Sequence, residues 1–192
     1  MVDLTGLHKH FILEHLGEGD VAVDFTMGNG NDTLFLSKTV GESGRVYAFD
    51  IQEAALESTR ERLVTNGAPE NYTLICASHH RVREFVNEPI KAGMFNLGYL
   101  PGSGKKAVTT LRETTMPAVE AALELLAPDG VLIVAIYPGH TEGELEGKML
   151  HEYFSTLSRF RICASEFKIL NSPTSPYFFL LEKSPKAKFG EI

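Results

Sequence analysis

Apolar and polar positions follow two rhythms along this chain. Apolar residues recur at helical spacing in several segments; over residues 4–16, for example, Leu4, Leu7, Phe11 and Leu16 lie near one face. Short apolar runs that end at turn residues separate these segments, as buried strands do. The predicted helices are 4–16, 31–40, 53–66, 108–126 and about 142–158. The predicted strands are 21–27, 45–51, 72–78, 94–100, 130–137, 160–170 and 177–183.

This alternation of strands and helices predicts an α/β fold, with a mainly parallel seven-stranded sheet and helices on both faces. The last two strands, 160–170 and 177–183, are joined by a turn without a helix, so the final strand should run antiparallel. No repeat or linker interrupts the pattern. Residues 1–184 are therefore expected to form a single domain, followed by a frayed tail at 185–192.

The composition supports one globular domain and limits the partners. The chain has 192 residues, of which 43% are hydrophobic and 22% charged, as in ordinary globular proteins. Its formal net charge is −7, from 18 basic and 25 acidic residues, which argues against a general nucleic-acid coat. Any RNA substrate would have to be met by a local basic patch.

Signals for membranes, secretion and metals are lacking in the sequence. No stretch approaches the roughly 20 apolar residues of a membrane span, and the first residues do not resemble a signal peptide. Cys76 and Cys163 stand far apart in apolar segments without a partner motif, so neither a disulfide nor a metal site is expected. These features predict a cytoplasmic protein without membrane contact.

The turn after the 21–27 strand is the first candidate site. It reads Asp24-Phe-Thr-Met-Gly-Asn-Gly-Asn-Asp-Thr33, where the glycines permit close backbone approach and a helix start offers free N–H groups. A nicotinamide-binding turn would have a third glycine at Thr33, and Asp24 would repel a pyrophosphate. The segment instead resembles motif I of class I S-adenosylmethionine-dependent methyltransferases, with Thr26 in place of the first glycine. The ammonium and sulfonium groups of that cofactor suit acidic residues.

The ends of the next two strands add further candidates for binding the cofactor. Asp50, followed by Gln52, is placed to bind ribose hydroxyls at the end of the 45–51 strand. Ser78 and His79 come where this methyltransferase fold contacts adenine. The cofactor-binding candidates are Asp24, Thr26, Gly28, Asn29, Gly30, Asn31, Asp32, Thr33, Asp50, Gln52, Ser78 and His79.

Candidate catalytic residues follow the 94–100 and 130–137 strands. Asn96 stands at the position of motif IV of the methyltransferase fold, and its amide carbonyl can accept a hydrogen bond from a substrate amine and aim the amine lone pair at the methyl group. Tyr99 would form an aromatic wall beside it. His140 would accept a proton near neutral pH.

Five basic residues follow the third and fourth strands and are candidates for contacting an anionic, phosphate-bearing substrate: Arg81, Arg83, Lys105, Lys106 and Arg112. They are expected on the same face as the cofactor, because the carboxyl ends of parallel strands lie together. The alternative is that they are solvated residues of loops and helix starts.

These motifs together resemble one bacterial family over essentially the whole chain. The matching segments are the turn at 24–33, Ser78-His79, the string Asn96-Leu-Gly-Tyr-Leu-Pro-Gly102 and Tyr137-Pro-Gly-His140. Members of this family carry the label rRNA methylase, and the family is associated with methylation of 5-(aminomethyl)-2-thiouridine at the tRNA wobble position. The string that begins at Asn96 is the most specific part of the resemblance.

The resemblance implies a Rossmann-like class I methyltransferase that transfers a methyl group from S-adenosylmethionine to the primary amine of a modified wobble uridine. It further implies the tRNA anticodon stem-loop as partner, and fold analogy suggests a homodimer. The chain departs from the family pattern at Asn31, at His80 and in Gly102-Ser-Gly-Lys105. These departures concern fine contacts with the substrate.

Three other functions are compatible with parts of the pattern. An rRNA or small-molecule methyltransferase would use the same cofactor site. A nicotinamide-dependent oxidoreductase is disfavoured by Asp24 and Thr33. A nucleotide-binding module without catalytic activity would need the glycine turn but not Asn96.

Overall fold

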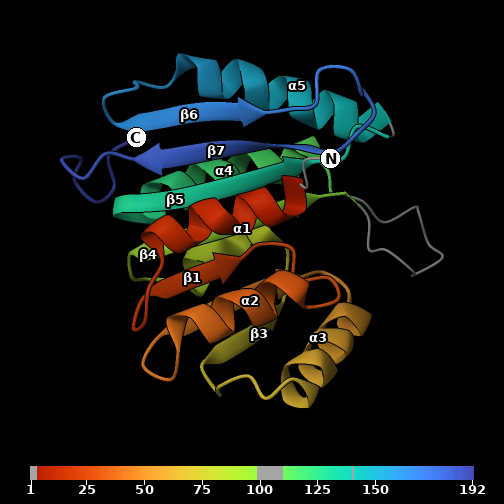
Figure 1. Cartoon of the computed structure of the whole chain (residues 1–192), viewed down its shortest axis with the longest axis vertical. Coiled ribbons are helices and arrows are strands. Elements are labelled where there is room, and N and C mark those ends of the chain that lie inside the picture. The colour runs from red at the N-terminus through yellow and green to blue at the C-terminus, as the bar shows by residue number, and fades with distance from the viewer. Residues whose placement is uncertain (1–3, 99–109, 140) are drawn as a thin grey trace.

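The computed structural model of the chain is a three-layer α/β sandwich (Figure 1). It describes residues 4–98, 110–139 and 141–192. The helices are α1 (Leu4–His15), α2 (Asn31–Val40), α3 (Glu53–Thr65), the 3-10 helix η1 (His79–Glu84), α4 (Arg112–Leu125) and α5 (Thr141–Thr156). The strands are β1 (Val21–Asp24), β2 (Arg45–Asp50), β3 (Tyr72–Cys76), β4 (Ile90–Leu97), β5 (Leu126–Ile136), β6 (Ile162–Phe167) and β7 (Tyr177–Lys183).

The sheet has the strand order β3-β2-β1-β4-β5-β7-β6. Only β7 runs antiparallel to its neighbours β5 and β6. This confirms the prediction made from the turn that joins the last two strands without a helix. The strand order reverses between β1 and β4, which are neighbours in the sheet. In open α/β sheets ligands bind at such a point, beyond the carboxyl ends of the strands. We call this side of the sheet the carboxyl edge, and the opposite side the amino edge.

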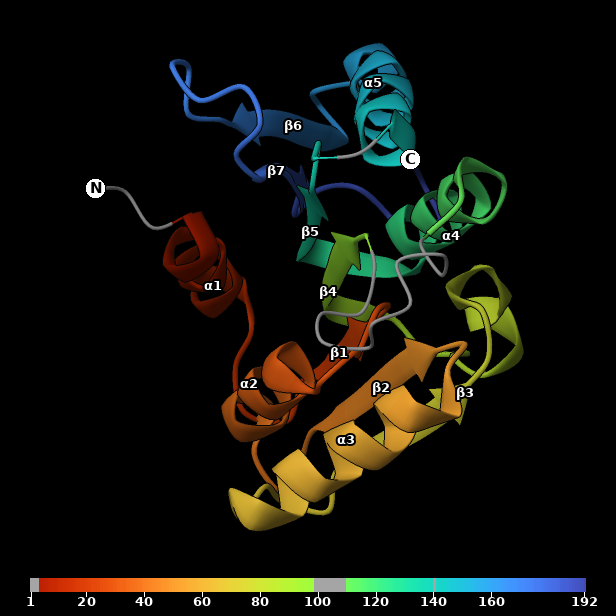
Figure 2. The same ribbon diagram turned by 90° about the vertical axis from the view of Figure 1, so that its right-hand side faces the viewer.

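Helices cover both faces of the sheet (Figure 2). Side chains alternate along β4: Ala92 and Met94 pack with α1 and α2, whereas Phe95 and Leu97 pack with η1, α4 and α5. Helix α3 covers the outer strands β2 and β3 on the same face as α2. Both faces of the central strands are therefore buried, which explains their nearly continuous apolar sequence.

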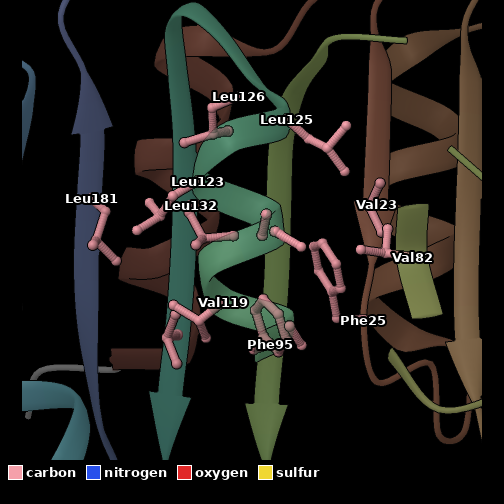
Figure 3. Close-up of a cluster of buried hydrophobic side chains, with 14 of the residues drawn as sticks. Val23, Phe25, Val82, Phe95, Val119, Leu123, Leu125, Leu126, Leu132 and Leu181 are labelled. Carbon is pink, nitrogen blue, oxygen red and sulfur yellow. The ribbon is translucent and has the colours of Figure 1, made fainter. Parts of the chain in front are cut away.

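The core between the sheet and α4 is built around stacked aromatic rings (Figure 3). The rings of Phe25 and Phe95 are nearly parallel, with centroids 4.1 Å apart. Val119 and Leu123 of α4 belong to the same cluster as these two rings and are fully buried. Phe25 is the residue directly after β1, so this packing also fixes the start of the candidate cofactor turn.

The structure confirms the predicted order of elements and refines several boundaries. Strand β1 is shorter than 21–27 because the chain turns after Asp24, and β4 begins at Ile90, before the predicted 94–100. The 3-10 helix η1 was not predicted. No helix among residues 4–98, 110–139 and 141–192 is long and apolar enough to cross a membrane.

The segment 185–192 differs from the frayed tail expected from the sequence. Ala187 is buried, and the N–H of Gly190 donates a hydrogen bond to the carbonyl of Glu124 at the end of α4. The side chain of Arg161 donates to the carbonyl of Ile192. The segment therefore packs against the amino edge. Its small and charged residues form no apolar pattern, so the sequence did not predict this packing.

The core around α4 predicts a clear contrast between two leucine truncations. Leu123→Ala removes a fully buried side chain and should lower the free energy of unfolding by about 2–5 kcal/mol. Leu170→Ala, at a position 94% exposed, should change it by less than about 0.5 kcal/mol. Urea denaturation followed by circular dichroism measures both, and equal losses would contradict the described core.

Candidate active site

The turn after β1 is held in position by contacts with α3. Gly30 has a φ of 75°, and a Cβ at this position would lie 2.9 Å from Thr59 of α3. The Thr59 hydroxyl donates a hydrogen bond to the carbonyl of Gly28, at 3.1 Å, and Nε of Arg62 donates to the carbonyl of Asn29. Glycine is required at position 30 by both the positive φ and the close approach of the helix.

Asp24 is a buried carboxylate at the end of β1. Its Oδ2 accepts a hydrogen bond from the hydroxyl of Thr33 at 2.6 Å, and its Oδ1 accepts one from the N–H of Thr26 at 3.1 Å. Burial, and next the nearby charge of Asp32, raise the pKa of Asp24 to about 7, against the smaller opposing effect of these hydrogen bonds. The protein itself therefore stabilises the negative charge of this carboxylate only in part.

Asp50 ends β2 beside the same turn. Its Oδ2 accepts a hydrogen bond from the N–H of Gly28, at 3.2 Å, and its Oδ1 accepts one from the N–H of Gln52 at 3.0 Å. Burial raises the pKa of Asp50, and its hydrogen bonds with backbone N–H groups oppose that rise. Together with Asp24 and Asp32, it makes the site strongly acidic, which suits a ligand that carries positive charge.

Asn96, near the end of β4, is tied to the residues that follow β1. Its backbone N–H donates to the hydroxyl of Thr26 at 2.7 Å, and its Nδ2 donates to Oδ2 of Asp32 at 2.6 Å. The hydroxyl of Tyr137, just after β5, donates to Oδ1 of Asn96 at 3.4 Å. Burial, with a further contribution from Asp32, raises the pKa of Tyr137, so this hydroxyl keeps its proton.

His79 supports the turn rather than lining an open surface. The residue is only 7% exposed, and its ring packs edge-on against Phe95, with ring centroids 5.6 Å apart. Burial lowers the pKa of His79 to about 4, and the ring hydrogen-bonds the backbone of Phe25. The sequence prediction that His79 contacts adenine is therefore not supported, because the side chain is turned into the core. Ser78 instead contacts Nδ1 of His80 through its hydroxyl, at 2.8 Å.

The remaining cofactor candidates lie along the same turn and the helix that follows it. The side chain of Asn29 accepts a hydrogen bond from Ser58 of α3 at 3.2 Å. Asn31, Asp32 and Thr33 form the first turn of α2. Gln52 precedes α3. The structure thus brings these candidates to one place, while their contacts with a cofactor stay predictions.

The described basic candidates are all engaged in ion pairs. Arg81 pairs with Glu84 of its own helix η1, and Arg112 pairs with Glu142 of α5 at 2.9 Å. Arg83 pairs with Glu124, two residues before β5 begins. Arg83 therefore points toward the amino edge, contrary to the expectation that it shares the cofactor face. The helix η1 turns the chain back along α4, which the sequence did not predict.

Four candidates lie outside the described residues: Tyr99, Lys105, Lys106 and His140. Among the described residues, no group of three His, Cys, Asp or Glu side chains is arranged to hold a metal ion. A pocket of about 540 Å³ lies between α4 and α5, lined by Leu111, Arg112, Glu113, Glu142 and Met149.

Two residues of the site were not among the sequence candidates. Lys9 of α1 forms an ion pair with Asp32, with 3.1 Å between Nζ and Oδ1. No motif marks Lys9, because its position depends on how α1 packs on the sheet. Tyr137 could have been found, since it is the last residue of the predicted strand 130–137 and so lies at the carboxyl edge.

Comparison with known proteins places the chain among methyltransferases. Residues 46–183 match a family model described as "Putative rRNA methylase". The "tRNA (mnm(5)s(2)U34)-methyltransferase, chloroplastic" of Arabidopsis thaliana is 37% identical in an alignment 185 residues long, and the match covers 91% of this chain and 67% of the relative.

Solved structures agree with this assignment. A "putative rRNA-methylase" from Clostridium thermocellum is 36% identical, with a TM-score of 0.91 over 95% of this chain and 98% of its own. A "putative methyltransferase" from Streptococcus mutans, solved in complex with SAH, is 36% identical, with a TM-score of 0.86 over 95% and 99% of the two chains. The chain therefore belongs to the family described as "Putative rRNA methylase", a family of S-adenosylmethionine-dependent methyltransferases.

Proposed function

We propose that this methyltransferase transfers a methyl group from S-adenosylmethionine to the primary amine of 5-(aminomethyl)-2-thiouridine at the wobble position of tRNA. One observation carries the proposal: the Asn96 amide is held beside an acidic cofactor turn, with its Oδ1 directed toward Tyr137 at the carboxyl edge. An amide oxygen at this place can accept a hydrogen bond from an amine. The activity named for the Arabidopsis relative is of this kind.

The residues of the turn fit the proposed cofactor. S-adenosylmethionine supplies an activated methyl group when bound, and it carries a sulfonium and an ammonium. The buried carboxylate of Asp24, whose burial raises its pKa to about 7, would gain a counter-charge from this ligand. Asp50 would accept hydrogen bonds from the ribose hydroxyls, and Ile51, which is next to it and 56% exposed, would offer apolar contact to the base. A pyrophosphate would meet repulsion from the same carboxylates.

The acceptor amine must be neutral when it attacks, because an ammonium has no lone pair. A pocket that excludes water favours the neutral amine, and the oxygen of Asn96 would orient its remaining N–H. His79 is a poor proton acceptor at neutral pH, since burial lowers its pKa to about 4. The proton that the ammonium loses is therefore not assigned to His79; solvent water or His140, which lies outside the described residues, would accept it.

The family description favours a second candidate function, methylation of rRNA. It would use the same cofactor turn and the same amide. The two substrates differ in the RNA that must reach the carboxyl edge, so the nature of the methylated nucleoside distinguishes them.

Methyl transfer to the wobble uridine predicts where an isotopic label will appear. Total RNA from cells that lack the activity is incubated with the protein and S-adenosylmethionine bearing a deuterated methyl group. Mass spectrometry of digested tRNA should show the label in 5-(methylaminomethyl)-2-thiouridine. Label confined to rRNA nucleosides would favour the second candidate, and label in neither RNA would reject both.

Asp50 and Asn96 should affect different steps. Asp50→Ala should weaken S-adenosylmethionine binding by about 100-fold, because charge-assisted hydrogen bonds to ribose are lost. Asn96→Ala should leave this Kd within about threefold while lowering kcat by about 100-fold, because the amine is no longer oriented. Calorimetry and initial rates give these values.

The control for this pair of variants is Asp129→Ala, which removes an exposed carboxylate near the start of β5. It should change neither the Kd nor kcat. A proportionate loss of binding and turnover in Asn96→Ala would contradict the role assigned to the amide.

The raised pKa of Asp24 predicts opposite pH dependences for stability and binding. Its pKa is about 7 in the folded protein against 3.8 for an ordinary Asp, so between these values only the folded state keeps the proton. The free energy of unfolding of the ligand-free protein should therefore decrease as pH rises through this window. Binding of the cationic cofactor should tighten as pH rises through about 7, because the ligand prefers the carboxylate.

Asp24→Asn tests this assignment with a side chain of the same shape. The variant should flatten both the thermal-stability profile and the calorimetric binding profile between pH 5 and pH 8.5, values chosen to bracket the titration near 7. Unchanged profiles would show that another group is responsible.

A further inference from the structure

We propose that Lys9 is a positioning residue that sets the orientation of the Asn96 amide by holding the carboxylate of Asp32 against it. The inference rests on the proposed function, in which Oδ1 of Asn96 receives the acceptor amine. It assigns a role at the active site to α1, the helix that precedes the first strand.

Three contacts in series carry this proposal. Nζ of Lys9 lies 3.1 Å from Oδ1 of Asp32, and the other oxygen of that carboxylate accepts a hydrogen bond from Nδ2 of Asn96 at 2.6 Å. Oδ1 of Asn96, at the far end of the amide, meets the hydroxyl of Tyr137 at 3.4 Å. The chain of contacts thus runs from α1 through α2 and β4 to the end of β5.

The Asp32 carboxylate decides which way the amide lies. The two ends of an asparagine amide have nearly the same shape, so their hydrogen-bond partners determine which end points where. A carboxylate can only accept hydrogen bonds, and it therefore selects Nδ2. The oxygen is left on the side of Tyr137, which is 38% exposed and lies at the carboxyl edge.

Asp32 needs a counter-charge because it stands among other acidic groups. Its charge and that of Asp50 both act on the buried carboxylate of Asp24. The N-terminal turn of α2 provides some compensation through its free N–H groups. Among the described residues, Lys9 is the cation that forms an ion pair with Asp32.

The Lys9 side chain is also held in place before any substrate arrives. Its ammonium lies 5.1 Å from the centroid of the Phe35 ring on α2, and the side chain is 30% exposed. Because this cation–π contact already restrains the long side chain, less conformational entropy is lost when the ion pair with Asp32 forms. α1 is itself packed on β4, β5 and β7, so the ammonium is presented from a rigid element.

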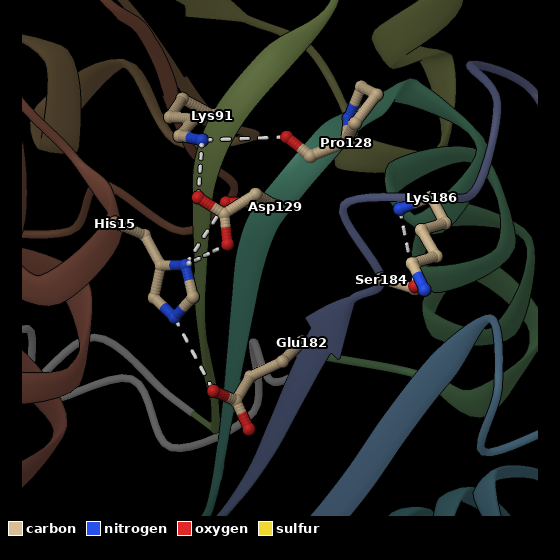
Figure 4. Close-up of polar contacts among 7 residues, drawn as sticks. All are labelled: His15, Lys91, Pro128, Asp129, Glu182, Ser184 and Lys186. Atoms are coloured by element: carbon tan, nitrogen blue, oxygen red, sulfur yellow. Dashed lines mark hydrogen bonds and ion pairs between the residues drawn. The ribbon is translucent and has the colours of Figure 1, made fainter.

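A second ion pair provides a matched control on the same sheet (Figure 4). Lys91, near the start of β4, lies 3.2 Å from Asp129, and its side chain is 21% exposed. Lys91 resembles Lys9 in chemistry and exposure, whereas Asp129, at 55% exposed, is more accessible than Asp32, at 14%, and this pair lies at the amino edge. Its loss should therefore have the structural cost of a broken ion pair without any effect on the amide.

The direct test observes the amide itself. In ¹H–¹⁵N spectra of the ligand-free protein, the side-chain NH₂ signals of Asn96 are identified by their absence in Asn96→Ala. Lys9→Met should shift these signals and speed the exchange of their protons with water, because the carboxylate is no longer held against Nδ2. Lys9→Arg should restore them, and Lys91→Met should leave them unchanged.

Kinetics with the tRNA substrate gives a second readout. Lys9→Met should lower kcat about fivefold or more while changing the Kd for S-adenosylmethionine less than about twofold. Lys9→Arg should recover most of the rate. In the Asp32→Asn background, Lys9→Met should cause no further loss, since both act through the same contact.

The outcomes separate this inference from the proposed function. Amide signals unaffected by Lys9→Met, or affected equally by Lys91→Met, would overturn the role of Lys9. Signals that respond as expected in a protein that does not methylate tRNA would support the positioning role and reject the proposed substrate. If Lys9→Met does not fold, Lys9→Gln replaces it in both measurements.

Discussion

The arrangement of the active site depends on one buried carboxylate, that of Asp24. It lies at the end of β1 without exposed surface, and the turn that follows folds around it through Thr26 and Thr33. A charge in this position is costly to bury, and its hydrogen bonds compensate it only in part. The free protein thus carries a cost that the proposed cationic cofactor would relieve, and this would link the stability of the turn to occupation of the site.

The topology concentrates the chemistry at the carboxyl edge. β1 and β4 lie side by side where the strand order reverses, so Asp24 and Asn96 are brought together although they are far apart in the chain. Asp50 joins them from β2 on the other side of β1. α1 and α2 approach from one face of the sheet, and the aromatic stack of Phe25 and Phe95 supports the turn from the other.

Much of this arrangement could be predicted from the sequence because it follows from local patterns and one rule of topology. Apolar periodicity marks every strand, and the carboxyl ends of parallel strands meet at one edge, which placed Asp24, Asp50 and Asn96 together. The packing of η1 and α1 decides three features that the sequence did not predict. These are the burial of His79, the orientation of Arg83 toward the amino edge, and the ion pair of Lys9 with Asp32. Such packing is decided by distant parts of the chain and leaves no local pattern.

Thr26 connects two segments that different motifs describe separately. Its hydroxyl accepts the backbone N–H of Asn96, so a side chain of the cofactor turn satisfies a backbone group at the end of β4. A glycine at position 26, as in the common form of motif I, would leave that N–H without this acceptor. Thr26→Gly would therefore leave the end of β4 dependent on another acceptor, such as water, to satisfy this backbone group.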